Sequence, residues 1–185
     1  MEQKLLKICV WIVIIVTAIF TVLTYTSDSL ALLKILSTVA SISEFLIVSY
    51  CNCLWKLINF LGIPRIYGEW KCSIIYEDKK TKKELRKETK VSIRQNVFNV
   101  RVNLDSDETN SYSILGRIET EHDRKYLVYV YKTSTKKEFR EKNRDQLGSA
   151  KLMIKDVNNL EGEYWTNNYT NGRMQLIKNK KKEKE

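Results

Sequence analysis

Few residues in this 185-residue chain have the types and spacing of a catalytic or metal site. The single histidine, His122, lies in the segment Glu121-His122-Asp123-Arg124, which predicts a charged hairpin turn. The acidic run Asp105-Ser106-Asp107-Glu108 lacks the glycine and the distal glutamate of an EF-hand calcium loop, so it is better interpreted as a solvated turn. We therefore expect no catalytic residues, no metal and no cofactor, in a protein that is not an enzyme.

The cysteines do not change this expectation. They form no CxxC pair and have no histidine cluster beside them, so they are interpreted as small apolar residues in a reducing compartment rather than as a disulfide framework or a zinc site. Three fall in the apolar N-terminal segments and one in the first predicted strand; they are Cys9, Cys51, Cys53 and Cys72.

The charge is distributed unevenly along the chain. Residues 1–64 carry four lysines against three acidic residues, so +9 of the total net charge of +10 falls on residues 65–185. A basic domain suits anionic partners, either phospholipid headgroups or nucleotide phosphates. A solvated face that keeps the domain soluble is the plainer explanation, and both interpretations stay open.

Two long apolar segments come first and predict a transmembrane hairpin over residues 1–64, with helices at about 6–27 and 33–58. Ile8–Ser27 has no charged side chain, and at about 1.5 Å per residue it covers the roughly 30 Å hydrocarbon core of a bilayer. Lys4 and Lys7 precede the first span, and Lys56 follows the second. The positive-inside rule therefore favours two cytoplasmic termini.

Glu44 lies near the middle of the second predicted span, where a carboxylate costs about 2.5–3.5 kcal/mol on insertion scales. One interpretation is a hydrogen bond between the two helices, to Thr17, Thr21 or Ser41. The other is a polar seam, completed by Ser37 and Ser41, that lines a pore or an oligomer contact when several subunits gather.

The rest of the chain predicts an all-β domain over residues 65–178, followed by a disordered tail at 179–185. Eight antiparallel strands in succession favour an up-and-down, lipocalin-like β-barrel whose interior holds one small ligand; a sandwich is the alternative. Lys136–Gln146, the one long connection, is expected to be a short helix or a lid. The predicted strands are Tyr67–Tyr76, Leu85–Gln95, Val97–Leu104, Tyr112–Glu121, Lys125–Thr133, Ser149–Asp156, Leu160–Thr166 and Gly172–Lys178.

Alternation supports these strands. In the third, Phe98, Val100, Val102 and Leu104 are expected to share one face, and in the sixth Ala150, Leu152 and Ile154 share another.

Short motifs at both ends of the barrel resemble known proteins. Gly68-Glu69-Trp70 resembles the Gly-x-Trp start of lipocalins and fatty-acid-binding barrels, in which an arginine of the last strand covers the tryptophan; Arg173 is the expected counterpart. Two transmembrane helices, the join Ile63–Tyr67, and the late segments Gly162–Asn168 and Gly172–Leu176 together resemble the two-transmembrane, β-strand-rich effectors of CBASS, the bacterial cyclic-oligonucleotide antiphage system.

This resemblance implies a function. A CD-NTase nucleotidyltransferase would make a cyclic nucleotide second messenger on infection, and the barrel would bind it. The effector would then form a homo-oligomer in the bacterial inner membrane, disrupt that membrane and cause abortive cell death. No DNA or RNA partner is implied, and no residue is carried over as a catalyst.

The barrel contains residue types suited to such a ligand, since phosphates need cations or backbone donors and bases need flat side chains. Asn167 could read a base edge. For each candidate residue a packing or surface role stays open, because period-two alternation does not by itself fix which residues face inward. The candidate ligand residues are Trp70, Arg94, Arg101, Arg117, Tyr131, Tyr164, Trp165, Asn167 and Arg173.

Two other functions stay open at this point. The lipocalin-like start also fits a membrane-tethered carrier or sensor of an apolar ligand, and a scaffold with an empty barrel would bind no small molecule. The chemistry of the lumen discriminates between them, because a polar and cationic lumen favours a nucleotide and a wholly apolar one favours a lipid.

Overall fold

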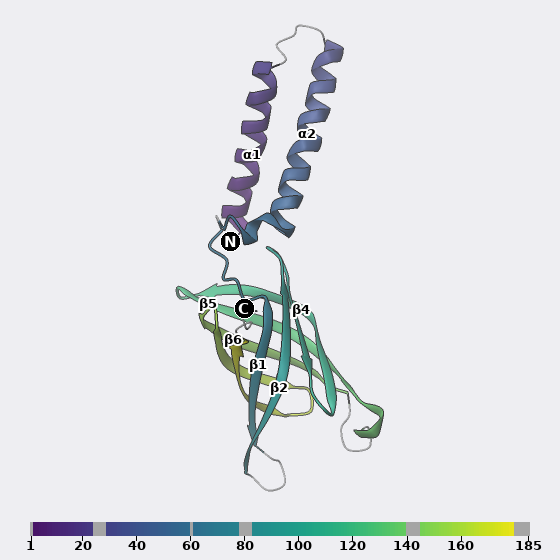
Figure 1. Cartoon of the computed structure of the whole chain (residues 1–185), viewed down its shortest axis with the longest axis vertical. Helices are drawn as coiled ribbons and strands as arrows, with labels where there is room; N and C mark the ends of the chain where they lie inside the picture. The colour runs from purple at the N-terminus through teal and green to yellow at the C-terminus, as the bar shows by residue number, and fades with distance from the viewer. Residues whose placement is uncertain (1, 24–28, 60, 78–82, 140–144, 180–185) are drawn as a thin grey trace, which may run out of the picture. The chain divides into compact units, whose positions relative to one another are not determined.

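The computed structural model describes residues 2–23, 29–59, 61–77, 83–139 and 145–179 (Figure 1). The chain forms two compact units, Met1–Ile63 and Pro64–Glu185, which are described separately below. The predicted disordered tail, apart from Asn179, lies outside the described residues.

The first unit contains two helices, α1 (Glu2–Leu23) and α2 (Ser29–Asn52), and the short 3-10 helix η1 (Leu54–Lys56). The second helix therefore ends before the predicted residue 58. Within the described part of the chain, the segment Lys34–Asn52 of α2 is long and apolar enough to cross a membrane, whereas the apolar part of α1, Cys9–Thr21, is shorter.

The hydroxyl groups considered as partners of Glu44 donate inside their own helices. Thr17 donates to the Val13 carbonyl at 2.7 Å, and Ser41 donates to the Ser37 carbonyl at 3.0 Å. Such bonds to the preceding turn are a common way for hydroxyls to be satisfied in a helix. The Glu44 side chain is exposed on the surface of α2. These hydroxyls therefore do not donate to Glu44, and the polar seam and a bond in which a hydroxyl accepts from a protonated Glu44 both stay predictions.

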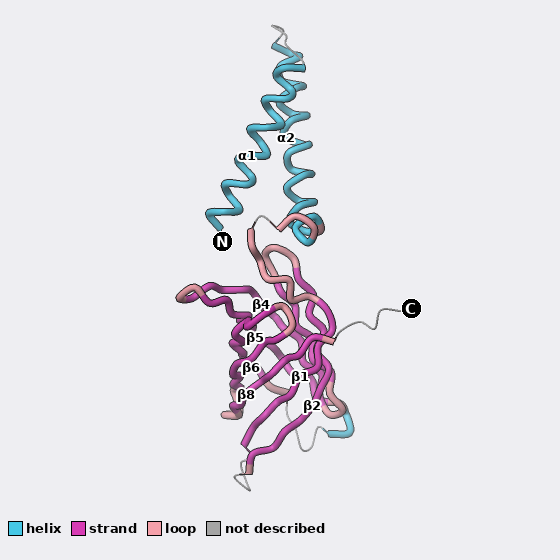
Figure 2. The backbone as a smooth tube through the Cα atoms, turned by 60° about the vertical axis from the view of Figure 1, so that its left-hand side comes forward, coloured by secondary structure: helices cyan, strands magenta, loops and turns pink. Residues whose placement is uncertain are grey.

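The second unit is a closed barrel of eight antiparallel strands in chain order, with the last strand paired to the first (Figure 2). This confirms the up-and-down barrel over the sandwich. The strands are β1 (Gly68–Glu77), β2 (Glu84–Gln95), β3 (Val100–Asp105), β4 (Thr109–Glu121), β5 (Arg124–Thr135), β6 (Leu147–Asp156), β7 (Asn159–Thr166) and β8 (Asn171–Lys178).

Alternation along the strands fills the barrel with one apolar cluster. In β6, Ala150 and Leu152 are fully buried and Ile154 packs against the same core, as predicted. The core takes one or more inward residues from every strand, so it lies within the sheet that closes around it. Since this cluster needs no residue from the helices, we expect residues 64–185 to fold on their own.

The third strand begins later than predicted. Residues 96–99 form a turn in which the Asn96 side-chain oxygen accepts hydrogen bonds from the backbone N–H groups of Phe98 (2.9 Å) and Asn99 (2.7 Å). Phe98 is consequently 52% exposed instead of sharing the inner face with Val100 and Val102. An asparagine side chain that bonds the following backbone favours a turn over a strand, and this overrides the alternating pattern.

Two expected turns are confirmed. His122 and Asp123 form the two-residue turn between β4 and β5, both with positive φ (45° and 63°), as hairpins of this type require. The acidic run ends β3 at Asp105 and forms the turn before β4, but it is not simply solvated, because Ser106 is buried and Glu108 lines the cavity described below. Lys136–Gln146 contains the 3-10 helix η2 (Lys137–Phe139), and its residues 140–144 lie outside the described part of the chain.

One end of the barrel is closed by Trp70, which is fully buried and donates from its indole nitrogen to the Ile66 carbonyl at 3.0 Å. The Lys178 ammonium lies 5.5 Å from the centre of the Trp70 ring. The prediction that Arg173 covers this ring is wrong. Antiparallel pairing brings the end of β8, not its beginning, to the start of β1, so Lys178 stands opposite Trp70 and Arg173 stands opposite Ile75.

Candidate ligand-binding site

A cavity of about 300 Å³ lies inside the barrel, toward the end away from Trp70. Its rim is formed where β1, β3, β5 and β7 end. Many of the side chains at this end are short serines and threonines, which fill less space than the large apolar residues near Trp70. The lining residues are Ile74, Tyr76, Lys87, Val102, Leu104, Ser106, Glu108, Thr109, Ser111, Tyr129, Tyr131, Thr133, Gln146, Tyr164, Thr166, Thr170 and Met174.

Two of the cavity's tyrosines lie over glycines on the neighbouring strand. Tyr131 stands opposite Gly148, and Tyr164 stands opposite Gly172. A Cβ atom on Gly148 would come within 2.5 Å of the Tyr131 ring, and one on Gly172 within 2.8 Å of the Tyr164 ring. Because only glycine leaves room for this contact, the two pairs fix where the rings lie against the cavity wall.

Further aromatic contacts extend this wall. The Tyr129 and Tyr131 rings are 5.8 Å apart at an angle of 45°, and the Tyr129 hydroxyl donates to the Met174 sulfur at 3.8 Å. Flat aromatic faces of this kind are suited to stacking on planar ligand groups.

Burial favours the neutral form of the tyrosine hydroxyls still further. It raises the pKa of Tyr131 and of Tyr129 well above the usual value near 10, and raises the pKa of Tyr164 to about 12. Tyrosine hydroxyls are neutral at pH 7 and can donate to an anionic ligand; because the Tyr129 hydroxyl already donates to Met174, those of Tyr131 and Tyr164 are the candidates.

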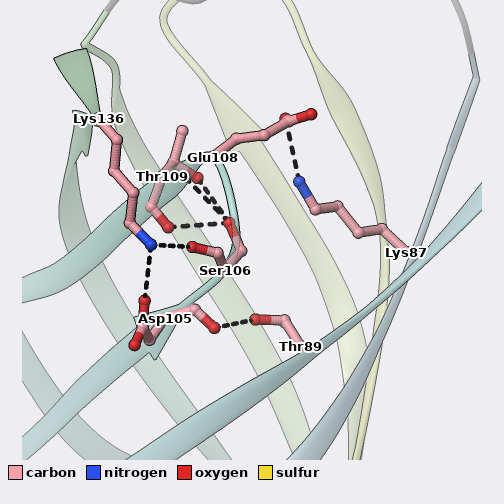
Figure 3. Close-up of polar contacts among 7 residues, drawn as sticks. All are labelled: Lys87, Thr89, Asp105, Ser106, Glu108, Thr109 and Lys136. Carbon is pink, nitrogen blue, oxygen red and sulfur yellow. Dashed lines mark hydrogen bonds and ion pairs between the residues drawn. The ribbon is translucent and has the colours of Figure 1, made fainter. Parts of the chain in front are cut away.

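Polar contacts tie the rim together (Figure 3). The Lys87 ammonium lies 3.1 Å from the Glu108 carboxylate, and the Lys136 ammonium donates to the Ser106 carbonyl at 2.8 Å and lies 3.6 Å from the Asp105 carboxylate. Among the described residues that line the cavity, Lys87 is the one cation and Glu108 the one acidic side chain.

The structure brings Tyr131 and Tyr164 together at the cavity, and it places Trp70 at the closed end of the barrel. Asn167 lies in the turn between β7 and β8, where its side-chain oxygen accepts from the Leu147 N–H at 3.1 Å. Arg117 is paired with Glu119, whose carboxylate accepts from the arginine Nε at 2.7 Å. Arg117 and the other predicted residues alternate with inward ones and are exposed on the outside of the barrel; the others are Arg94, Arg101, Trp165 and Arg173.

Comparison with known proteins places this barrel in a family. A family model described as "Cap15, cyclic dinucleotide receptor domain" matches residues 61–178. The chain belongs to the Cap15 family. It is also 31% identical, over 181 residues, to "CD-NTase-associated protein 15" of Staphylococcus schleiferi, in an alignment that covers 95% of this chain and 96% of that protein.

Sequence reasoning missed several residues of the Cap15 barrel cavity. Tyr76 could have been assigned from alternation, because it follows Trp70 in steps of two along β1. Tyr129 is among the barrel's aromatic residues, and its step of two from Tyr131 indicates the same face. Lys87 and Glu108 gave no such signal, since each lies in a charged segment that also fits a solvated surface.

Proposed function

We propose that the cavity binds a cyclic dinucleotide made by a CD-NTase, and that the protein is a CBASS effector. The observation that carries the proposal is a tyrosine- and hydroxyl-lined cavity inside a domain of the Cap15 cyclic dinucleotide receptor family. The relative in Staphylococcus schleiferi is named for association with a CD-NTase, which supports the same source of ligand.

The lining offers partners for each part of such a ligand. Bases stack on the rings of Tyr131 and Tyr164, and phosphate oxygens accept from Lys87 and from the neutral Ser111 hydroxyl. A volume of about 300 Å³ is at the lower end of the range for small-molecule sites, so part of the ligand lies in the open mouth.

The lining also bears on the apolar-carrier alternative. Ile74, Val102, Leu104 and Met174 give the cavity an apolar side, but hydroxyls and an ion pair form the rest of it. A wholly apolar ligand would leave these polar groups without water or a partner, at a cost for each. This mixture supports a nucleotide over a lipid.

The helices are proposed to act in the bacterial inner membrane, with both termini cytoplasmic. The apolar segment Lys34–Asn52 supports a membrane anchor. Ligand binding would promote self-association of the barrels, gathering the helices so that Glu44, Ser37 and Ser41 form a polar seam. The resulting loss of membrane integrity would cause abortive death of the infected cell.

A thermal-shift screen of residues 64–185 against cyclic di- and trinucleotides tests the binding step. A ligand that binds the folded barrel but not the unfolded chain raises the melting temperature of the barrel by mass action. Lys87→Met should weaken the selective hit by about 10- to 100-fold, the value of a charged hydrogen bond, whereas Lys90→Met, on the outer face of the same strand, should leave it unchanged. A flat panel together with co-purified lipid would favour the carrier.

A further inference from the structure

The one cation that lines the described part of the cavity already has an anionic partner. Lys87 projects inward from β2, and Glu108 reaches it from the turn between β3 and β4, with 3.1 Å between ammonium and carboxylate (Figure 3). The two side chains are 30% and 42% exposed, so the pair lies at the mouth and in contact with solvent.

This pair creates a conflict for an anionic ligand. A cyclic dinucleotide carries two phosphates, each a single negative charge, and a phosphate oxygen that approaches Lys87 also approaches the Glu108 carboxylate. Like charges at such a separation repel each other strongly in a partly buried site. The Lys87 ammonium has three donors, so it could bond the Glu108 carboxylate and a ligand phosphate together, but the carboxylate repels the phosphate.

The turn that carries Glu108 is held independently of its side chain. The Glu108 carbonyl accepts from the Lys136 N–H at 3.0 Å, and the Ser106 hydroxyl donates to the Thr109 carbonyl at 2.9 Å. The Lys136 ammonium also bonds the Ser106 carbonyl. These contacts do not use the Lys87–Glu108 ion pair, so the turn keeps them when a ligand phosphate replaces the carboxylate at Lys87.

We propose that Glu108 is a built-in competitor of the ligand: its carboxylate occupies Lys87 when no nucleotide is bound, and a ligand phosphate displaces it. The inference rests on the proposed cyclic dinucleotide function. It assigns Glu108 a regulatory role. Competition from its carboxylate lowers the affinity of Lys87 for any anion, so a higher concentration of ligand is needed for binding.

The test is isothermal titration of the full chain in detergent micelles with a panel of cyclic di-AMP, cyclic di-GMP, cyclic GMP–AMP, cyclic UMP–AMP and cyclic di-UMP. Glu108→Gln should bind the best of these about 10-fold more tightly than the unmodified protein. The matched control is Glu161→Gln, which removes the acid of an ion pair with Lys155 on the outside of the barrel and should bind as the unmodified protein does.

A double variant separates the competitor from a general charge effect. If Glu108 acts through Lys87, then Lys87→Met combined with Glu108→Gln should bind no more tightly than Lys87→Met alone. Unchanged or weaker binding by Glu108→Gln, in a protein whose unmodified form binds the ligand, overturns the competitor and leaves the receptor function intact. Failure of all variants and of the unmodified protein to bind any of the five overturns both proposals.

Discussion

The contact between Tyr131 and Gly148 gives the sharpest test of how the cavity is shaped. Gly148→Ala would place a methyl group 2.5 Å from the Tyr131 ring carbon Cζ, 2.6 Å from its hydroxyl oxygen and 2.8 Å from the Trp165 carbonyl oxygen. Normal carbon contacts are about 3.5–4.0 Å, so the ring must move by about 1 Å. Overpacking of this kind costs about 1–3 kcal/mol.

For a barrel unit of this size the cost corresponds to a fall in melting temperature of about 4–12 °C. The assay is urea denaturation of residues 64–185, carried out as a double-mutant cycle with Tyr131→Leu, which removes the ring atoms that the new methyl group meets. Gly148→Ala should then be less damaging in the Tyr131→Leu background by about 1–2 kcal/mol, with a remainder from the Trp165 carbonyl.

Additive effects of the two substitutions, within about 0.5 kcal/mol, would refute the idea that Gly148 positions this ring. Gly162→Ala is the control. Its methyl group would meet the Lys151 carbonyl oxygen and the Leu152 backbone, not a tyrosine, so it should destabilise the barrel without coupling to Tyr131.

Three further outcomes are expected. Burial raises the pKa of Tyr164 from the unfolded value near 10 to about 12, so its contribution to stability is complete below pH 10 and is lost as the pH rises through about 12. Burial also raises the pKa of Tyr129 and Tyr131, so these residues lose stability in the same direction above pH 10; urea midpoints and tyrosinate absorbance across about pH 9–12 would follow this loss. Burial also raises the pKa of the Cys72 thiol to about 12, so pulsed alkylation should label Cys72 only after the barrel unfolds, and labelling at the native rate of an exposed thiol would contradict this. Glu44→Leu should leave ligand binding unchanged and abolish leakage from proteoliposomes; retained leakage would remove the polar seam from the mechanism.

Much of the fold could be predicted because strand alternation and turn residues are local signals. Ala150, Leu152 and Ile154 show the pattern plainly, and His122-Asp123 marks its turn. Phe98 was assigned to the wrong side because Asn96 ends the strand pairing through its own side chain, which a count of alternating residues does not detect.

The site was harder to predict because binding residues are brought together by register. Arg94 and Arg101 stand opposite each other on β2 and β3 and face outward, although arginine is the residue type best suited to phosphate. The pairing of Lys87 with Glu108 joins residues of two different hairpins, and no spacing in the chain indicates it. Likewise, the choice of Lys178 over Arg173 above Trp70 depends on strand direction, not on composition.

The contacts at the closed end of the barrel also shorten the connection between the barrel and α2. The entering segment is held from two strands, because the Gln95 side chain bonds both the Pro64 carbonyl (2.9 Å) and the Ile66 N–H (3.0 Å) and the Lys178 ammonium donates to the Arg65 carbonyl (3.2 Å). Residues 53–63, which include η1, connect α2 to this fixed point, and fully extended they would span at most about 40 Å. In the proposed membrane-anchored form, the barrels on one membrane would be confined to a thin layer beside it. Their effective concentration would be correspondingly high, so a weak attraction between ligand-bound barrels would be enough to gather them.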